Sequence, residues 1–223
     1  MFYRLVQVLF RIYFLLFHRL RVRGMEELER FLASLPAGGS VILASNHASY
    51  LDPPAIGTVF PRALRFVAWD GLFRVPLFAT LIRTLGAVPV SPENKNSAAG
   101  LLRQVMGFLE SGYSVLIFPE GERTPDGKML PLEGGVALIA LKTGRPIVPV
   151  WLEGTWRAFP PHLRFPRPYR ITLTFGKPLL PDALPKELTE RQKRDRLLAD
   201  LKHSLETMRD LPKIGRASCR ERV

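Results

Sequence analysis

The chain has 223 residues, of which 47% are hydrophobic, and it carries a formal net charge of +12. This length suits one domain with a full hydrophobic core, and this composition excludes a disordered chain. The single cysteine excludes an intrachain disulfide and a cysteine-rich zinc site. The basic balance favours anionic partners, namely nucleic acid, anionic lipid, or phosphorylated substrates and thioesters.

The N-terminal segment, residues 1–20, predicts a helix with a wide apolar face. Arg4, Arg11 and His18 recur every seven residues, and Gln7 falls on the same side, which predicts one narrow polar stripe. A helix lying in a membrane interface fits this pattern best, because it combines an apolar face with arginine at the water boundary. The alternatives are a membrane-spanning helix, which would bury two arginines, and a helix packed on the protein's own core.

This apolar start argues against nucleic acid as the partner, and the lack of a small-residue cleavage site argues against a signal peptide. We therefore expect residues 1–23 to form a membrane-interfacial helix and residues 24–212 to form one folded domain. Residues 213–223 follow a proline, show no apolar periodicity and carry four bases against one acid. We interpret them as a non-native tail.

Over the rest of the chain, short apolar runs alternate with helical patterns. Helices are expected over 25–35, 71–85, 97–111, 134–142 and 189–208, with a further helix starting at 52–54. Strands are expected over 40–44, 65–68, 87–90, 115–118, 147–152 and 170–175. This alternation predicts an α/β domain with a mostly parallel central sheet flanked by helices. In such sheets ligands bind beyond the carboxyl ends of the strands.

His47 and Asp52 lie five residues apart, across a predicted turn from strand to helix. An imidazole can take the proton from an attacking hydroxyl, and a carboxylate on its other nitrogen fixes the tautomer and stabilises the imidazolium. No serine or cysteine nucleophile is required if the substrate brings its own hydroxyl. The competing interpretation makes His47 a turn residue and Asp52 only a helix N-cap.

A second candidate group, Glu120, Gly121 and Arg123, directly follows the strand expected over 115–118. Arg123 offers a planar fork of donors suited to phosphate, and Gly121 lets the backbone approach a ligand closely. Glu120 would orient Arg123 or a substrate hydroxyl. The competing interpretation is a solvated turn that continues into the Pro-Asp-Gly sequence at 125–127.

The segment from Asn46 to Asp52, Asn-His-Ala-Ser-Tyr-Leu-Asp, resembles the Asn-His-x4-Asp signature of the glycerolipid acyltransferases. Phe-Pro-Glu-Gly-Glu-Arg-Thr at 118–124 resembles the Phe-Pro-Glu-Gly-Thr-Arg-Ser block of the same 1-acyl-sn-glycerol-3-phosphate acyltransferase family. Ile-Val-Pro-Val at 147–150 resembles the family's fourth block. The order and spacing of the blocks match, and the resemblance covers roughly residues 21–180.

This resemblance implies transfer of a fatty acyl chain from acyl-CoA or acyl carrier protein to a lysophospholipid hydroxyl in phospholipid biosynthesis. It makes residues 24–212 an acyltransferase domain on the cytoplasmic face of a cell membrane, with neither a metal nor a separate cofactor. It implies that His47 is the general base and Asp52 its partner. The substrate-binding residues that it implies are Asn46, Glu120, Gly121 and Arg123.

The chain departs from the family pattern at two positions. Pro92 stands where the second block has an arginine that holds phosphate, and Trp69 stands where many members have a lysine. The expected acceptor is 1-acyl-sn-glycerol-3-phosphate, and a different lysolipid or polar acceptor is the next candidate. The sequence also leaves open a His-dependent thioester hydrolase and a non-catalytic basic membrane-binding module.

Overall fold

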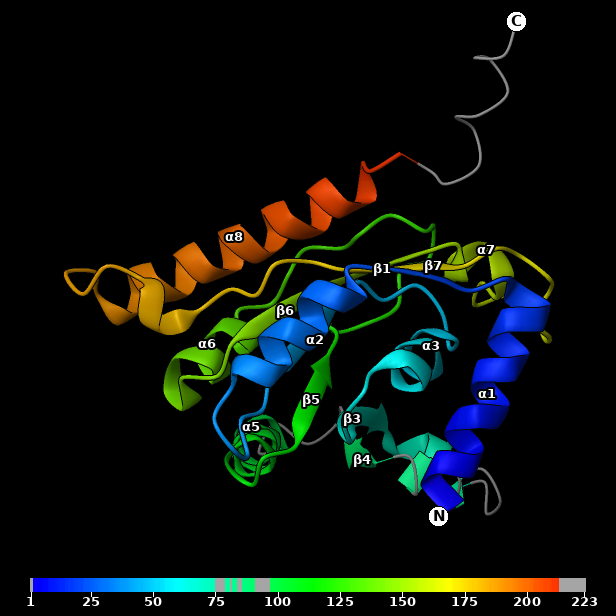
Figure 1. Cartoon of the computed structure of the whole chain (residues 1–223), viewed down its shortest axis with the longest axis horizontal. Helices are drawn as coiled ribbons and strands as arrows, with labels where there is room; N and C mark the ends of the chain where they lie inside the picture. Colours follow the sequence, from blue (N-terminus) through cyan, green and yellow to red (C-terminus); the bar gives the residue numbers. More distant parts are fainter. Residues whose placement is uncertain (1, 75–78, 81, 84–85, 91–96, 213–223) are drawn as a thin grey trace, which may run out of the picture.

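A central sheet organises the chain (Figure 1). The computed structural model describes residues 2–74, 79–80, 82–83, 86–90 and 97–212. Across these residues the sheet has seven strands in the order β1-β7-β6-β2-β5-β3-β4. All neighbouring strands are parallel except β6 and β7, so the expected mostly parallel α/β sheet is confirmed. The strands are β1 (Arg21–Arg23), β2 (Ile42–Ser45), β3 (Leu64–Trp69), β4 (Ala87–Val90), β5 (Ser114–Ile117), β6 (Ile147–Glu153) and β7 (Thr172–Phe175).

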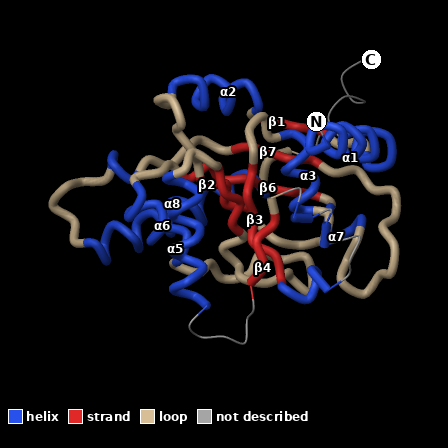
Figure 2. The backbone as a smooth tube through the Cα atoms, turned by 90° about the horizontal axis from the view of Figure 1, so that it is seen from below, coloured by secondary structure: helices blue, strands red, loops and turns tan. Residues whose placement is uncertain are grey.

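Helices cover both faces of this sheet (Figure 2). One face carries α1 (Phe2–His18), α2 (Met25–Ser34) and α3 (Asp52–Val59), and the other carries α5 (Ser97–Glu110), α6 (Gly135–Thr143) and α8 (Glu190–Arg209). Strand residues alternate between the two cores: Leu43 packs in the first, and Ile42 and Ala44 pack in the second. This period of two comes from the strand pleat, and it makes strands buried on both faces read as continuous apolar runs.

Helix α1 packs on the protein with one side and exposes apolar residues on the other. Phe14 is completely buried, and Gln7 Nε2 donates a 2.8 Å hydrogen bond to the backbone oxygen of Gly57 in α3. The opposite side exposes Leu5, Val8, Leu9, Ile12, Leu15 and Leu16. No helix in the described part of the chain is long and apolar enough to cross a membrane.

Some residues of the expected polar stripe of α1 face the protein, and others face the solvent. His18 is completely buried, with Nε2 3.0 Å from Tyr13 Oη and Nδ1 3.2 Å from the Tyr169 carbonyl oxygen. Arg11, by contrast, is exposed. The stripe lies at the border between the packed side and the bare side of the helix. His18 and Gln7 therefore find hydrogen-bond partners in the protein.

Several short elements escape the sequence pattern: β1, α7 (Thr155–Ala158) and the 3-10 helix η2 (Pro181–Ala183). β1 takes its hydrogen bonds from β7, far along the chain, so no local pattern marks it. The helix expected over 71–85 begins as the 3-10 helix η1 (Asp70–Arg74), and its remainder lies partly outside the described residues. The segment 213–223, interpreted as a tail, lies wholly outside them.

Candidate active site

Asn46 anchors the first motif to the sheet. It directly follows β2, and its side-chain amide exchanges two hydrogen bonds with the backbone of Leu152 in the neighbouring β6. Oδ1 accepts from the Leu152 N–H at 2.7 Å, and Nδ2 donates to the Leu152 carbonyl at 3.1 Å. The amide thus extends the parallel pairing of β2 and β6 past the end of β2. This geometry favours a role in holding the loop, and the expected contact of Asn46 with substrate stays a prediction.

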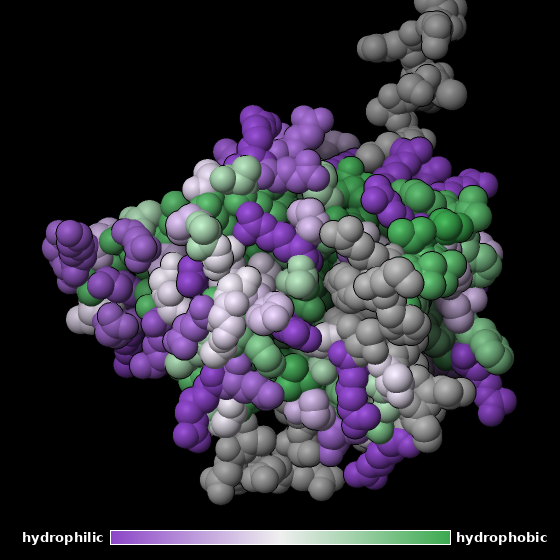
Figure 3. Space-filling view, turned by 60° about the horizontal axis from the view of Figure 1, so that its bottom comes forward, coloured by the Kyte–Doolittle hydropathy of each residue, from purple (hydrophilic) through white to green (hydrophobic). Residues whose placement is uncertain are grey.

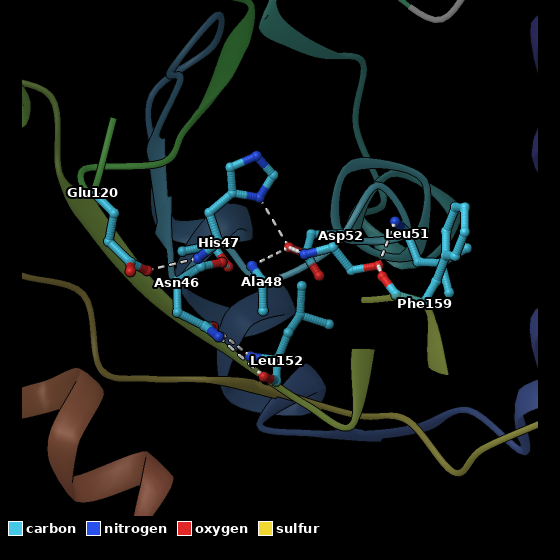
Figure 4. Close-up of polar contacts among 10 residues, drawn as sticks. Asn46, His47, Ala48, Leu51, Asp52, Glu120, Leu152 and Phe159 are labelled. Atoms are coloured by element: carbon cyan, nitrogen blue, oxygen red, sulfur yellow. Dashed lines mark hydrogen bonds and ion pairs between the residues drawn. The ribbon is translucent and has the colours of Figure 1, made fainter. Parts of the chain in front are cut away.

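His47 and Asp52 form a hydrogen-bonded pair at the carboxyl end of β2 (Figure 4). His47 Nδ1 lies 2.9 Å from Asp52 Oδ2, and the Asp52 side chain is completely buried. Because a carboxylate only accepts hydrogen bonds, Nδ1 carries the proton and Nε2 carries the lone pair. The imidazole stacks on Phe118, with ring centroids 3.9 Å apart, which fixes the ring plane.

Asp52 is more than a helix cap. It is the first residue of α3, yet its carboxylate does not cap that helix and turns back to the preceding loop. Oδ2 accepts from the backbone N–H groups of Ala48 and Ser49, both at 2.7 Å, in addition to His47. The interpretation of Asp52 as only an N-cap is therefore wrong. The converging donors hold one carboxylate oxygen in place, and this oxygen orients the imidazole.

Glu120 fastens the two motif loops to each other. It is 6% exposed, and Oε1 accepts from the His47 backbone N–H at 2.7 Å while Oε2 accepts from the Leu130 N–H at 2.6 Å. Burial raises the pKa of Glu120, and these two backbone hydrogen bonds act in the opposite direction. Since both oxygens are engaged by backbone, the geometry favours a role in positioning His47. The expected contact of Glu120 with the acceptor stays a prediction.

Arg123 lies against Tyr50, a residue inside the first motif. The centre of its guanidinium group is 3.7 Å from the centroid of the Tyr50 ring, and Nη2 donates to Tyr50 Oη at 3.0 Å. Nη1 is buried and has no hydrogen-bond partner among the described residues. Gly121, with φ of 76°, turns the backbone sharply in the left-handed region ahead of Arg123. Nη1 of Arg123 can therefore donate a hydrogen bond to a ligand.

A cavity of about 1350 Å³ connects these groups. Its polar end includes His47, Tyr50, Gly121 and Arg123. Its walls are mainly apolar, as shown by Leu64, Phe66, Leu101, Val105, Val136 and Ile139. A large apolar space with a few polar groups suits a ligand with a hydrocarbon chain and a charged head.

The structure thus sorts the predicted site residues into two groups. His47, Gly121 and Arg123 line the cavity. Asn46, Asp52 and Glu120 do not line it: Asp52 and Glu120 bind His47, and Asn46 binds the backbone of Leu152. Sequence reasoning missed Tyr50 and Phe118 as side chains that contact Arg123 and His47. Both stand within the motif segments, so their position in the sequence was the available signal.

The side chains of the two residues that depart from the family pattern lie outside the described structure. Pro92 lies outside the described residues, and only the backbone of Trp69, at the end of β3, is described. Arg123 is therefore the cation that the described structure places at the polar end of the cavity.

Comparison with known proteins agrees with this arrangement. The family model described as "Acyltransferase" matches residues 19–153, a segment that contains both motifs and the strands that carry them. The chain belongs to the acyltransferase family.

Particular relatives carry a more specific name. A chloroplastic 1-acyl-sn-glycerol-3-phosphate acyltransferase of Brassica napus, BAT2, is 31% identical over 145 residues, which are 65% of this chain and 40% of that protein. The 1-acyl-sn-glycerol-3-phosphate acyltransferase of Borreliella burgdorferi is 30% identical over 122 residues, 55% of this chain and 49% of that protein. The matches therefore span about half or less of these curated relatives.

A solved structure shares the fold over almost the whole chain. The crystal structure of the 1-acyl-sn-glycerophosphate acyltransferase PlsC from Thermotoga maritima has a TM-score of 0.73 and 26% sequence identity. The match covers 95% of this chain and 81% of that one.

Proposed function

We propose that this protein is an O-acyltransferase that moves a fatty acyl chain from acyl-CoA or acyl carrier protein to the free hydroxyl of a lysophospholipid. The observation that carries the proposal is the His47–Asp52 pair, with its Nε2 lone pair at the polar end of an apolar cavity beside Arg123. The names of the relatives make 1-acyl-sn-glycerol-3-phosphate the first acceptor to test. The reaction belongs to phospholipid biosynthesis.

In this mechanism His47 is the general base. Nε2 takes the proton of the acceptor hydroxyl as its oxygen attacks the thioester carbonyl, and a tetrahedral intermediate forms. The buried Asp52 carboxylate stabilises the imidazolium that results. When the carbon–sulfur bond breaks, the imidazolium returns the proton to the leaving thiolate. The products are the acylated lipid and the free thiol of CoA or of the carrier protein.

Arg123 binds the acceptor phosphate in this proposal. Within the described part of the chain its Nη1 is buried and has no hydrogen-bond partner, and a phosphate oxygen would supply an acceptor for it. The apolar walls hold the acyl chains and keep water from competing with the lipid hydroxyl. In this proposal the bare apolar side of α1 lies in the membrane interface on the cytoplasmic face of the cell membrane, and the lysophospholipid enters the cavity from there.

The test measures CoA release by the purified chain with acyl-CoA and a panel of lysophospholipids. The wild type should release CoA only when an acceptor is present. His47→Ala and Asp52→Asn should each lower kcat by about 10²- to 10⁴-fold, because each removes part of the general base. His203→Ala, at an exposed histidine on α8, is the matched control and should act as wild type.

The same assay distinguishes the competing functions. Full activity in His47→Ala would overturn the mechanism. CoA release that needs no acceptor identifies a thioester hydrolase, and the absence of release with every donor and acceptor leaves a membrane-binding module. Comparison of lysophospholipid head groups in the panel then identifies the acceptor that this chain prefers.

A further inference from the structure

Two large apolar side chains stand out as the most exposed of their kind among the described residues. Phe165 is 80% exposed and Leu16 is 79% exposed. Leu16 lies near the carboxyl end of α1, and Phe165 lies in the segment 160–170 between α7 and β7. One exposed apolar side chain needs no explanation, whereas several exposed on the same surface mark an interaction site.

These two segments are fastened to each other through His18. The His18 ring lies 3.2 Å from the Tyr169 carbonyl oxygen, and the Ile171 N–H donates to the His18 carbonyl at 3.0 Å. In Figures 1 and 2 the segment and α1 lie on the same, right-hand side of the molecule. Figure 3 shows hydrophobic side chains gathered on that side with hydrophilic ones around them. The exposed sides of both segments can therefore meet one flat partner.

The charge around Phe165 selects an anionic partner. No acid occurs between Gly154 and Pro181. Phe165 stands between Arg164 and Arg167, both exposed. Two hydrogen bonds brace this basic segment, from Arg167 Nε to the Arg157 carbonyl at 2.7 Å and from Arg157 Nη1 to Tyr169 Oη at 2.9 Å. An aromatic ring flanked by arginines matches a bilayer surface, where the ring enters the acyl region and the guanidinium groups contact phosphates.

The cavity reaches the surface beside these two segments, since its lining residues Pro161 and His162 are exposed. Pro161 and His162 of this segment and Gln7 and Phe10 of α1 all contribute to its lining. A bilayer that contacted both segments would thus meet the rim of the cavity, and a lipid could leave the bilayer for the cavity without crossing water.

We infer that residues 160–168 form a second membrane contact, in which Phe165 inserts into an anionic bilayer beside α1. One helix lying flat can rotate about its axis, whereas a helix and a separate insertion point define a plane. The second contact therefore fixes the orientation that places the cavity rim on the lipid surface. This inference rests on the proposed function only in that the substrates are membrane lipids.

The experiment measures co-sedimentation of the full chain with phosphatidylcholine vesicles that contain or lack phosphatidylglycerol. Phe165→Glu should weaken binding to the anionic vesicles by about 10-fold or more, because the free energy of burying the ring is lost. Leu180→Glu is the matched control, since Leu180 is also exposed but belongs to the connection between β7 and α8, which in Figure 1 runs to the side away from α1. It should bind as wild type. Equal binding by Phe165→Glu and wild type would overturn the inference.

A second measurement reports insertion directly. Phe165→Cys, in a Cys219→Ser background, is labelled with a polarity-sensitive fluorophore and mixed with the anionic vesicles. The label should move to an apolar environment, while the same label on Leu180→Cys should stay in water; a label at 165 that stays in water would contradict insertion. Neither measurement uses an acyl donor. A chain that binds vesicles through Phe165 without releasing CoA would overturn the proposed function and leave this inference standing.

Discussion

At the scale of single residues, the position of the Arg123 guanidinium group depends on its contacts with Tyr50. The ring supports the guanidinium from one side, and its hydroxyl accepts a hydrogen bond from Nη2. A cation above an aromatic ring is stabilised by about 0.5–2 kcal/mol, and the contact also removes rotamer freedom before the ligand arrives. If Arg123 holds the acceptor phosphate, Tyr50 sets where that phosphate lies.

We expect Tyr50→Leu to raise KM for the acceptor by about 10-fold with little change in kcat, because it removes both the stacking and the hydrogen bond. Tyr50→Phe keeps the stacking and should raise KM only a few-fold. Steady-state kinetics with varied lysophospholipid measure both constants. Tyr113→Leu is a matched control, since Tyr113 also supports an arginine, Arg65 at 4.5 Å, but does not line the cavity. A fall in kcat without a change in KM would contradict this role.

The sequence motifs contain residues that the structure brings together at one edge of the sheet, but they do not indicate which of these residues line the cavity and which hold the loops. His47 and Arg123 are recognisable because their chemistry is carried by their own side chains. Asn46 contacts the backbone of Leu152, and Glu120 contacts the backbone N–H groups of His47 and Leu130. Any residue except proline offers the same N–H group. Partners of this kind leave no trace in the sequence.

At the scale of elements, α1 packs on the protein's own core, as one interpretation of its sequence predicts, and its place in a membrane interface stays a prediction. Its packed side belongs to the core, and its bare side exposes a row of apolar residues. Periodicity predicts such a helix, but it does not state which polar residues face the protein. His18 shows the difference, since an apparently polar position of the helix is completely buried.

Burial of His18 gives a pH dependence that can be tested. Burial lowers the pKa of His18, while its hydrogen bond to the Tyr169 carbonyl acts in the opposite direction. The folded state therefore favours the neutral ring, and the unfolded chain binds the proton more readily. The stability that His18 contributes is present above its ordinary pKa of about 6.5 and is lost as the pH falls below that value.

We expect the wild-type Tm to fall more between pH 7.5 and pH 5.5 than the Tm of His18→Gln, which cannot be protonated in this range. At pH 7.5 the variant itself should be less stable by about 1 kcal/mol or more, because it loses buried hydrogen bonds. Thermal unfolding followed by circular dichroism measures both effects. His203→Gln, at an exposed site, should keep the wild-type pH dependence; an equal pH dependence in His18→Gln and wild type would refute the assignment.

At the scale of the whole molecule, the alternation of strands and helices predicted the layers but not the order of the strands. β2 and β5 are adjacent although β3 and β4 lie between them in sequence, and this adjacency brings the two motifs to one site. The reversed direction of β7 relative to β6 is set by a long connection through α7 rather than by any local signal.

A prediction at this scale concerns residues 213–223. Deletion of this segment should change Tm by less than about 1 °C and leave CoA release unchanged, because its sequence shows no apolar periodicity and carries four bases against one acid. Binding to anionic vesicles should weaken only slightly, since most of the basic residues precede the segment. Paired scanning calorimetry and activity measurements test this, and a loss of either stability or activity would show that the segment is part of the enzyme.

The pairing of β1 with β7 also determines when β1 can join the sheet during synthesis on the ribosome. Synthesis at about 5–20 residues per second separates these two strands by an interval on the order of ten seconds. Throughout that interval β1 has no strand to pair with and His18 has no Tyr169 carbonyl to approach. A bilayer surface would offer the nascent α1 an apolar phase before the late strand exists. In that order of events, α1 would bind the bilayer first, and β1 would pair with β7 afterwards, on a chain already attached to the membrane.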